Sequence, residues 1–147
     1  MDQELKKALA LLPHGPEFRF IDRLLSLVPG CSAQGEYAVK GYEPFLCGHF
    51  PGQPLFPGVL LVEAGAQLAG IAVQSDPKVK PFAGLKLTAL RNIKITGSAK
   101  PGEVVRLEAR ITGRLANLVQ VEVSASVNRQ TVMEGALTLS GDPGARP

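Results

Sequence analysis

Residues 44–74 carry the strongest structural signal in the chain and read PFLCGHFPGQPLFPGVLLVEAGAQLAGIAVQ. The first part, residues 44–58, holds four prolines and three glycines in fifteen residues, which excludes a regular helix or strand. Its phenylalanines and leucines indicate that this loop is ordered and partly buried. Long loops in compact domains often carry function, so the loop is a candidate site.

Residues 59–74 predict a helix that is buried on most of its surface. Alanine and leucine, both good helix formers, dominate the segment, and Pro57 suits the first turn. The segment is apolar nearly all round, as in a helix enclosed by the rest of a domain. Five small residues would let it pack closely on a sheet: Ala64, Gly65, Ala66, Ala69 and Gly70.

The flanking sequence predicts an antiparallel sheet wrapped around this helix, which is an α+β fold. Apolar and polar residues alternate in several segments, as in strands with one buried face. About four strands would follow the helix. We expect one domain over residues 1–147, with residues 141–147 as a flexible tail. The other predicted elements are a short helix at residues 2–11 and strands at residues 18–28, 32–39, 104–111, 119–127 and 131–139.

The composition is that of a globular protein, with 45% hydrophobic residues. No secretory signal is visible, which favours a cytoplasmic protein without membrane insertion. The two cysteines and two histidines form no metal-binding pattern, so we expect no metal. Residues 78–114 hold nine basic and two acidic side chains. This bias predicts either an anionic partner or a solvated strand face. It lacks interleaved aromatic residues, which argues against nucleic acid.

Glu63 is the first candidate for chemistry, because it lies early in an otherwise apolar helix, one turn before Gln67. Burying an unpaired carboxylate is costly, which favours the protonated form that a general acid needs. The alternative is a structural glutamate that accepts hydrogen bonds from its neighbours.

His49 is the second candidate, in the rigid GHFPG segment of the loop. A histidine is the natural base near neutral pH, although a lone histidine is often only a structural donor. Gly58 falls near the helix start, where its free N–H could stabilise a developing oxyanion or where the glycine simply permits a turn. Cys47 is a poor nucleophile candidate because Cys/His catalysis would also need a third orienting group and a matching geometry. His14 is interpreted as a hydrogen-bonding loop residue.

Three segments together resemble the bacterial 3-hydroxyacyl-[acyl-carrier-protein] dehydratases. They are EPFLCGHFPGQPLFPGVLLVEAGAQLAG at residues 43–70, LLPHGPEFRFIDR at residues 11–23 and KPGEVVRLEARI at residues 100–111. The resemblance covers most of residues 9–140 and is sharpest over residues 43–70. It implies a hot-dog fold, in which a curved antiparallel sheet wraps a long central helix. It also implies a homodimer or a trimer of dimers.

The resemblance also assigns roles to residues of the motif. His49 matches the catalytic histidine and Glu63 the catalytic acid, contributed by different subunits at the dimer interface. Gly58 matches the glycine whose backbone N–H holds the thioester carbonyl. The substrate-binding residues expected beside them are Phe50, Phe56, Pro57, Val59 and Gln67. The chain departs from the family pattern at Gly15, at Cys47 and over residues 85–99.

The implied reaction is dehydration of a (3R)-3-hydroxyacyl chain to the trans-2-enoyl chain in fatty-acid or related biosynthesis. The chain would be held on the 4′-phosphopantetheine thioester of acyl carrier protein, and no cofactor is implied. Two alternatives stay open. The first is another hot-dog enzyme, an acyl thioesterase or an enoyl-CoA hydratase. The second is a non-catalytic acyl-binding subunit.

Overall fold

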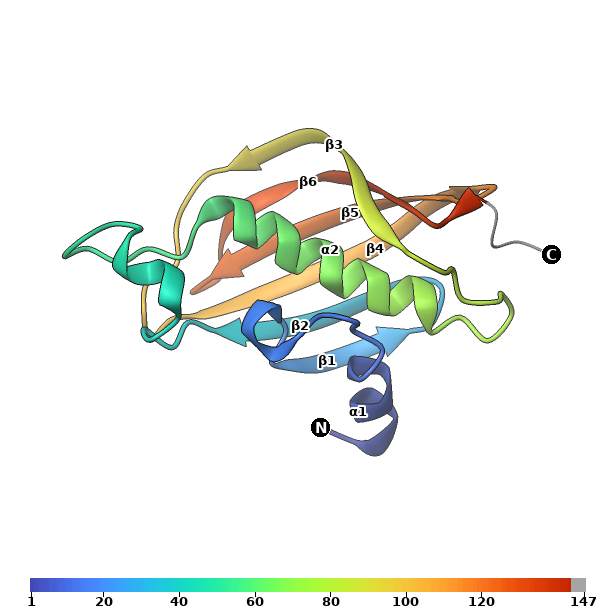
Figure 1. Ribbon diagram of the computed structural model, residues 1–147, viewed down its shortest axis with the longest axis horizontal. Helices are drawn as coiled ribbons and strands as arrows, with labels where there is room; N and C mark the ends of the chain where they lie inside the picture. Colours follow the sequence, from blue (N-terminus) through green and yellow to red (C-terminus); the bar gives the residue numbers. More distant parts are fainter. Residues whose placement is uncertain (144–147) are drawn as a thin grey trace.

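The computed structural model describes residues 1–143, and its main feature is a six-stranded antiparallel sheet (Figure 1). The strands lie in the order β1-β2-β4-β5-β6-β3, so β4, β5 and β6 are neighbours both in the chain and in the sheet. Their bounds are β1 (Arg23–Val28), β2 (Ser32–Ala38), β3 (Lys86–Ile95), β4 (Val104–Leu115), β5 (Leu118–Val127) and β6 (Gln130–Ser140).

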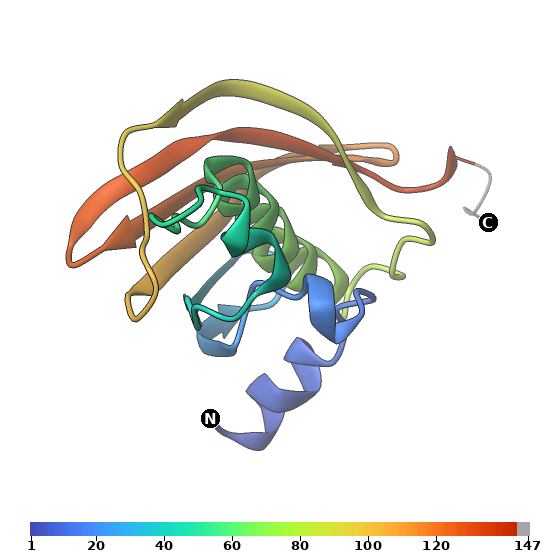
Figure 2. The same cartoon turned by 60° about the vertical axis from the view of Figure 1, so that its left-hand side comes forward.

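Helix α2 (Gly58–Gln74) lies along the concave side of the sheet, which curves over it in Figure 2. The helix is buried on nearly every side, as its uniformly apolar sequence predicted. It approaches the sheet closely at Gly65, where an added Cβ would lie 3.0 Å from Cβ of Val123 on β5. These observations confirm the predicted fold, a curved antiparallel sheet around a long central helix.

Strand β3 is one of the two edges of the sheet, and β1 is the other. It pairs antiparallel with β6 on one side, and no other described strand lies along its second side. Leu90 and Ile95 on this strand are exposed, at 56% and 46%. Unpaired strand edges with apolar side chains favour pairing with another chain.

The segment before the sheet differs from the prediction in one respect. Helix α1 (Gln3–Leu9) is present, with Asp2 as its side-chain cap. The predicted strand from Phe18, however, begins only at Arg23, because the preceding residues form the 3₁₀ turn η1 (Pro16–Phe18). The backbone at Phe18 and Phe20 is hydrogen-bonded to a helix side chain, Gln67, and so is not available to a neighbouring strand.

Two further expectations concern the C-terminal tail, predicted to be flexible from residue 141, and the absence of membrane insertion. Gly141 and Asp142 donate backbone hydrogen bonds to Asn117 and Ala83, and the rest of the tail predicted as flexible, residues 144–147, lies outside the described residues. None of the helices in residues 1–143 is both long enough and apolar enough to span a bilayer.

Candidate active site

Glu63 lies in the second turn of α2, and its carboxyl group is held by its neighbour one turn later. Nε2 of Gln67 donates to Oε2 of Glu63 over 3.0 Å. The same amide donates to the carbonyl of Phe18 and accepts from the N–H of Phe20, both over 2.9 Å. Gln67 is 2% exposed, so all its hydrogen-bonding groups are used inside the protein. It therefore acts as a brace between the N-terminal segment and Glu63.

His14 is the residue that the sequence interpretation missed. Its Nε2 lies 3.5 Å from Oε2 of Glu63, although the two residues are far apart in the chain. Its backbone carbonyl accepts a hydrogen bond from Nε of Arg19 over 2.7 Å, which fixes the loop that carries it. The only available signal was the LLPH segment of the family motif, which gives no indication of what the imidazole faces.

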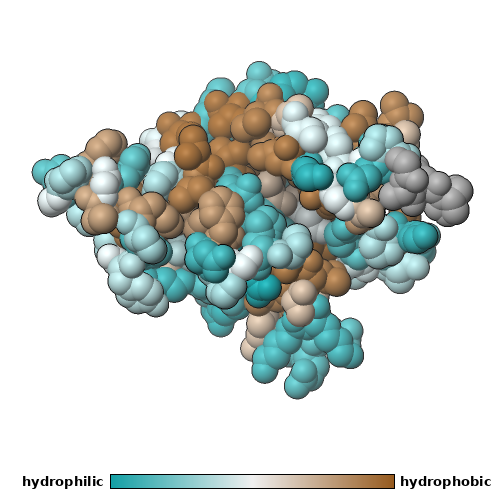
Figure 3. All heavy atoms as spheres, viewed as in Figure 1, coloured by the Kyte–Doolittle hydropathy of each residue, from teal (hydrophilic) through white to brown (hydrophobic). Residues whose placement is uncertain are grey.

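Glu63 and His14 line a cavity of about 540 Å³ between α2, the N-terminal segment and the start of β3. Its wall is polar and apolar in about equal parts, so an acyl chain could lie along the apolar part while its polar end meets Glu63 and His14. In Figure 3 hydrophobic residues gather over α2 and β3 on this face. The apolar wall is formed by Leu11, Leu12, Pro13, Ala66, Gly70, Ile71, Phe82, Leu85, Leu87 and Leu139.

His49 is half-buried in the loop before α2, and the loop itself sets its orientation. Its Nδ1 lies 2.9 Å from the carbonyl of Leu55, which can only accept, so Nδ1 carries the proton. Nε2 therefore carries the lone pair that a general base needs. The backbone N–H of Leu55 donates back to the carbonyl of His49 over 2.7 Å, and the ring stacks on Phe50 at 4.2 Å.

One subunit does not bring the two catalytic candidates together. Within residues 1–143, the groups that contact the Glu63 carboxyl come from His14 and Gln67, and His49 is absent from the cavity wall. The helix rises by about 1.5 Å per residue, so Glu63 lies roughly 7.5 Å along it from Gly58, where the loop ends. Within the described residues, His49 therefore makes no recorded contact with this carboxyl.

The other predicted substrate-binding residues occupy different environments. Gly58 begins α2, and an added Cβ there would lie 2.9 Å from Ile95 on β3. No acceptor is recorded for its N–H among the described residues, as expected for the first turn of a helix. Pro57 is the N-cap, and Phe50 and Val59 are exposed, at 52% and 71%. Phe56 is a core residue, 2% exposed.

The loop that carries His49 is anchored at its start by Tyr37 and Glu43. The Tyr37 hydroxyl donates to Oε2 of Glu43 over 2.6 Å, and the backbone N–H groups of Lys40 and Gly41 donate to the same carboxyl. Burial opposes ionisation of Glu43, but these donors outweigh it and hold its pKa below the ordinary value. Burial, followed by the bond to Glu43, raises the pKa of Tyr37, so the phenol stays protonated and donates.

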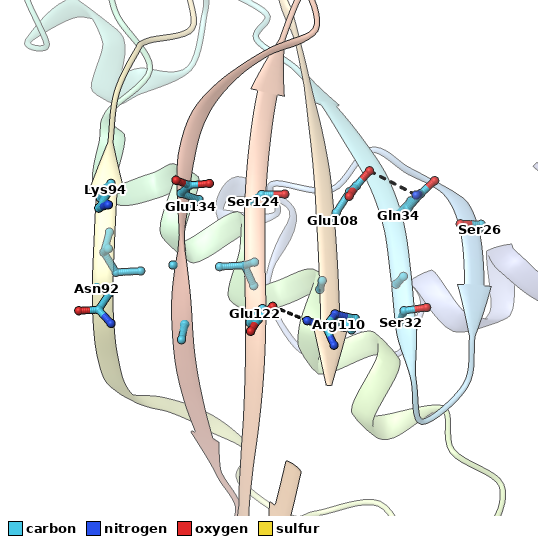
Figure 4. A pocket seen from close by; sticks show the side chains of 16 residues that line it. Ser26, Ser32, Gln34, Asn92, Lys94, Glu108, Arg110, Glu122, Ser124 and Glu134 are labelled. Carbon is cyan, nitrogen blue, oxygen red and sulfur yellow. Dashed lines mark hydrogen bonds and ion pairs between the residues drawn. The ribbon is translucent and has the colours of Figure 1, made fainter. Parts of the chain in front are cut away.

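A second depression, of about 750 Å³, crosses the outer face of the sheet (Figure 4). Two of its polar pairs satisfy each other: Arg110 pairs with Glu122 at 2.5 Å, and Gln34 donates to Glu108 over 3.3 Å. It contains neither a histidine nor a cysteine. The cavity beside α2 is therefore the better candidate for acid–base chemistry.

Comparisons with known proteins identify relatives that match over most of the chain. The sequence is 38% identical to the 3-hydroxyacyl-[acyl-carrier-protein] dehydratase FabZ of Roseiflexus castenholzii over 137 residues, 90% of this chain and 92% of the relative. It is 35% identical to the FabZ of Clostridioides difficile, over 91% of this chain and 92% of the relative.

Solved structures of low sequence identity share the fold. The dehydratase heterocomplex ApeI:P from Xenorhabdus doucetiae matches with a TM-score of 0.77 at 16% identity, over 94% of this chain and 91% of that one. Zebra fish thioesterase superfamily member 2 matches with a TM-score of 0.68 at 17% identity, over 92% of both chains. A family model described as the FabA-like domain matches residues 12–136. Because this match and the FabZ relatives both span most of the chain, the protein belongs to the FabA-like family.

Proposed function

We propose that this protein removes water from a (3R)-3-hydroxyacyl thioester on acyl carrier protein and leaves the trans-2-enoyl thioester. Membership of the FabA-like family and the dehydratase names of its relatives support this reaction. The observation that carries the proposal is the setting of Glu63, a carboxyl group held by Gln67 in the wall of a cavity that also has an apolar side. An acid at that position can act on a hydroxyl group borne by an acyl chain.

The chemistry divides between two side chains. Nε2 of His49 takes the proton from the carbon next to the thioester, and Glu63 gives a proton to the hydroxyl group on the following carbon. The C–H and C–O bonds break, a carbon–carbon double bond forms and water leaves. The N–H of Gly58 would donate to the thioester oxygen, which gains negative charge as the neighbouring carbon loses its proton.

This division requires a homodimer in which His49 of one subunit faces Glu63 of the other. The unpaired edge of β3 and the exposed side chains of Leu90, Ile95 and Val59 supply an apolar surface for a second copy. Phe50 is also exposed and lies next to His49 in the loop. A second subunit that covered this surface would enclose the site and exclude water from it. A trimer of dimers would have to form through other surfaces, because the second copy would already cover this one.

On this proposal the thioester carrier is an acidic protein. Some of the basic side chains of residues 78–114 form no ion pair among residues 1–143 and could bind it. Lys86, Arg110 and Arg114 are paired with acidic residues and contribute little net attraction. The remaining cations of the stretch that form no ion pair among residues 1–143 are Lys78, Lys80, Arg91, Lys94, Lys100 and Arg106. The reaction would take place in the cytoplasm, where carrier-bound acyl chains are made.

The test is turnover by the purified full chain. It is given the same 3-hydroxyacyl chain on acyl carrier protein and on coenzyme A, and enoyl thioester and free thiol are both measured. We expect enoyl product from the carrier-bound substrate, and hydration of the enoyl thioester in reverse. Release of free thiol would identify a thioesterase, faster turnover of the coenzyme A substrate would identify a hydratase of that carrier, and tight binding without either product would identify an acyl-binding subunit.

A further inference from the structure

We propose that His14 is a positioning residue that, with Gln67, fixes one oxygen of Glu63 and leaves the other for the substrate. This inference rests on the proposed function, in which Glu63 is the acid. The two oxygens of the Glu63 carboxyl group have different surroundings. Both recorded contacts, from Gln67 at 3.0 Å and from His14 at 3.5 Å, are to Oε2. Within the described residues, Oε1 has no hydrogen-bond partner.

The His14 ring is positioned by its loop and by a contact with Phe18. Its loop is fixed by Arg19, which donates to the carbonyls of His14 and Leu12 over 2.7 and 3.2 Å. Its face stacks against Phe18, with ring centroids 6.3 Å apart and planes 26° apart. Phe18 is itself tied to α2 through its carbonyl, which accepts from Gln67. The imidazole is thus positioned by the same brace that holds the carboxyl.

The environment of Nδ1 determines where the proton of His14 lies. Nδ1 is buried and has no hydrogen-bond partner within residues 1–143. A proton on this atom would be a buried donor without an acceptor, which is costly, whereas a lone pair there costs less. The ring is therefore neutral with its proton on Nε2, the atom that faces Glu63. His49 has the opposite tautomer, because its Nδ1 donates to the carbonyl of Leu55.

The consequence for the reaction is a division of labour between the two oxygens of Glu63. Oε1, the unpartnered oxygen, carries the proton to the leaving hydroxyl. As that proton departs, negative charge develops on the carboxylate, and the N–H groups of Gln67 and His14 stabilise it at Oε2. The 3.5 Å separation is long for a hydrogen bond, and such contacts shorten when substrate closes a site.

Two variants of similar size separate a positioning role from a structural one. The amide nitrogen of glutamine reaches where Nε2 lies, whereas the amide of asparagine reaches only to the position of Nδ1. We expect His14→Asn to lower kcat about tenfold with KM changed less than about twofold, and His14→Gln to retain kcat within about threefold. Exposed Glu17, in the same segment, supplies the control, and Glu17→Gln should match the wild type.

A double-mutant cycle shows whether His14 acts through Glu63. In a Glu63→Gln background, His14→Asn should reduce the residual rate by less than about twofold, because the group it positions has gone. An equal tenfold loss in both backgrounds, or a wild-type kcat for His14→Asn, would overturn the proposal. Inactivity of the wild type on every 3-hydroxyacyl thioester would instead count against the proposed function.

NMR of the histidine rings tests the contact between His14 and Glu63 even if the wild type shows no turnover. The chain has two histidines, so imidazole nitrogen NMR of the wild type, with His14→Gln for assignment, gives one signal set for each ring. We expect His14 to be protonated on Nε2 and His49 on Nδ1, and the His14 Nε2 resonance to move in Glu63→Gln. A His14 ring protonated on Nδ1, or a resonance unaffected by Glu63→Gln, would refute the contact.

Discussion

The loop at residues 44–57 and helix α2 supply the two catalytic candidates by opposite means. His49 is oriented by a bond to Leu55, six residues away, within a segment rich in proline and glycine. Glu63 is oriented by side chains whose partners lie more than forty residues away, such as the bonds from Gln67 to Phe18 and Phe20. One half of the site is therefore a local structure, and the other depends on the complete fold.

The largest expected effect on activity comes from replacing either of the two catalytic candidates, His49 or Glu63. His49→Ala removes the base and Glu63→Gln removes the acid, so each should lower kcat/KM by at least about a hundredfold. Neither should lower Tm greatly, because neither side chain is fully buried. The measurement is turnover of 3-hydroxyacyl-[acyl-carrier-protein], with thermal unfolding as the control. A variant of either residue with wild-type kcat/KM would remove that residue from the mechanism.

A mixing experiment tests whether the two halves meet across subunits. His49→Ala and Glu63→Gln proteins, unfolded and refolded together, should recover roughly a quarter of the wild-type rate. Half of the random dimers are then mixed, and one of their two sites is intact. Refolding each variant alone is the control. If both residues acted within one subunit, mixing would restore nothing.

The fold was largely predictable because its elements have local signatures. The uniformly apolar stretch predicted α2 to within one residue of its start, and strict alternation predicted β4 and β5. Strand β3 has no such alternation, since most of its residues on both faces are exposed, and its bounds could not be predicted. The first strand was predicted too early because the side chain that occupies the backbone before Arg23 comes from α2.

Only part of the candidate site was predictable from the sequence. Composition and spacing identified His49 and Glu63, and the family resemblance suggested roles for them. The placement of His14 beside Glu63 was not predictable, because a contact across forty-nine positions leaves no periodic or spacing signal. The buried environment of Phe56 was equally hidden, since a phenylalanine in a functional loop is compatible with either a core or a substrate contact.

A smaller effect is expected from the brace on the helix side. Gln67→Leu leaves the N–H of Phe20 and the carbonyl of Phe18 without their partner, which should lower the free energy of unfolding by about 2–4 kcal/mol. It should also lower kcat about tenfold, because Glu63 loses a donor. Gln53→Leu, at an exposed loop position, is the control and should change neither quantity. An unchanged stability in Gln67→Leu would show that the brace is dispensable.

The smallest effect is expected on the loop side, at Tyr37. Tyr37→Phe removes one donor to the Glu43 carboxylate and should lower the free energy of unfolding by about 1–2 kcal/mol at neutral pH. Tyr42→Phe is the control, because Tyr42 is 80% exposed, and it should leave stability unchanged. Chemical denaturation of the three proteins provides the comparison.

The pH dependence of this effect follows from Glu43. Its pKa is lower in the folded protein than the ordinary value of 4.5, so its contribution is present above that value and is lost as the pH falls through the lower, folded-state pKa. Wild-type stability should therefore fall on acidification below the ordinary value, and Tyr37→Phe should show a shallower fall over the same range, since its carboxylate has one donor fewer. Parallel acid limbs for the two proteins would show that the hydroxyl of Tyr37 does not stabilise the ionised carboxylate, and that the loop is held in place by its proline and glycine backbone and its packing alone.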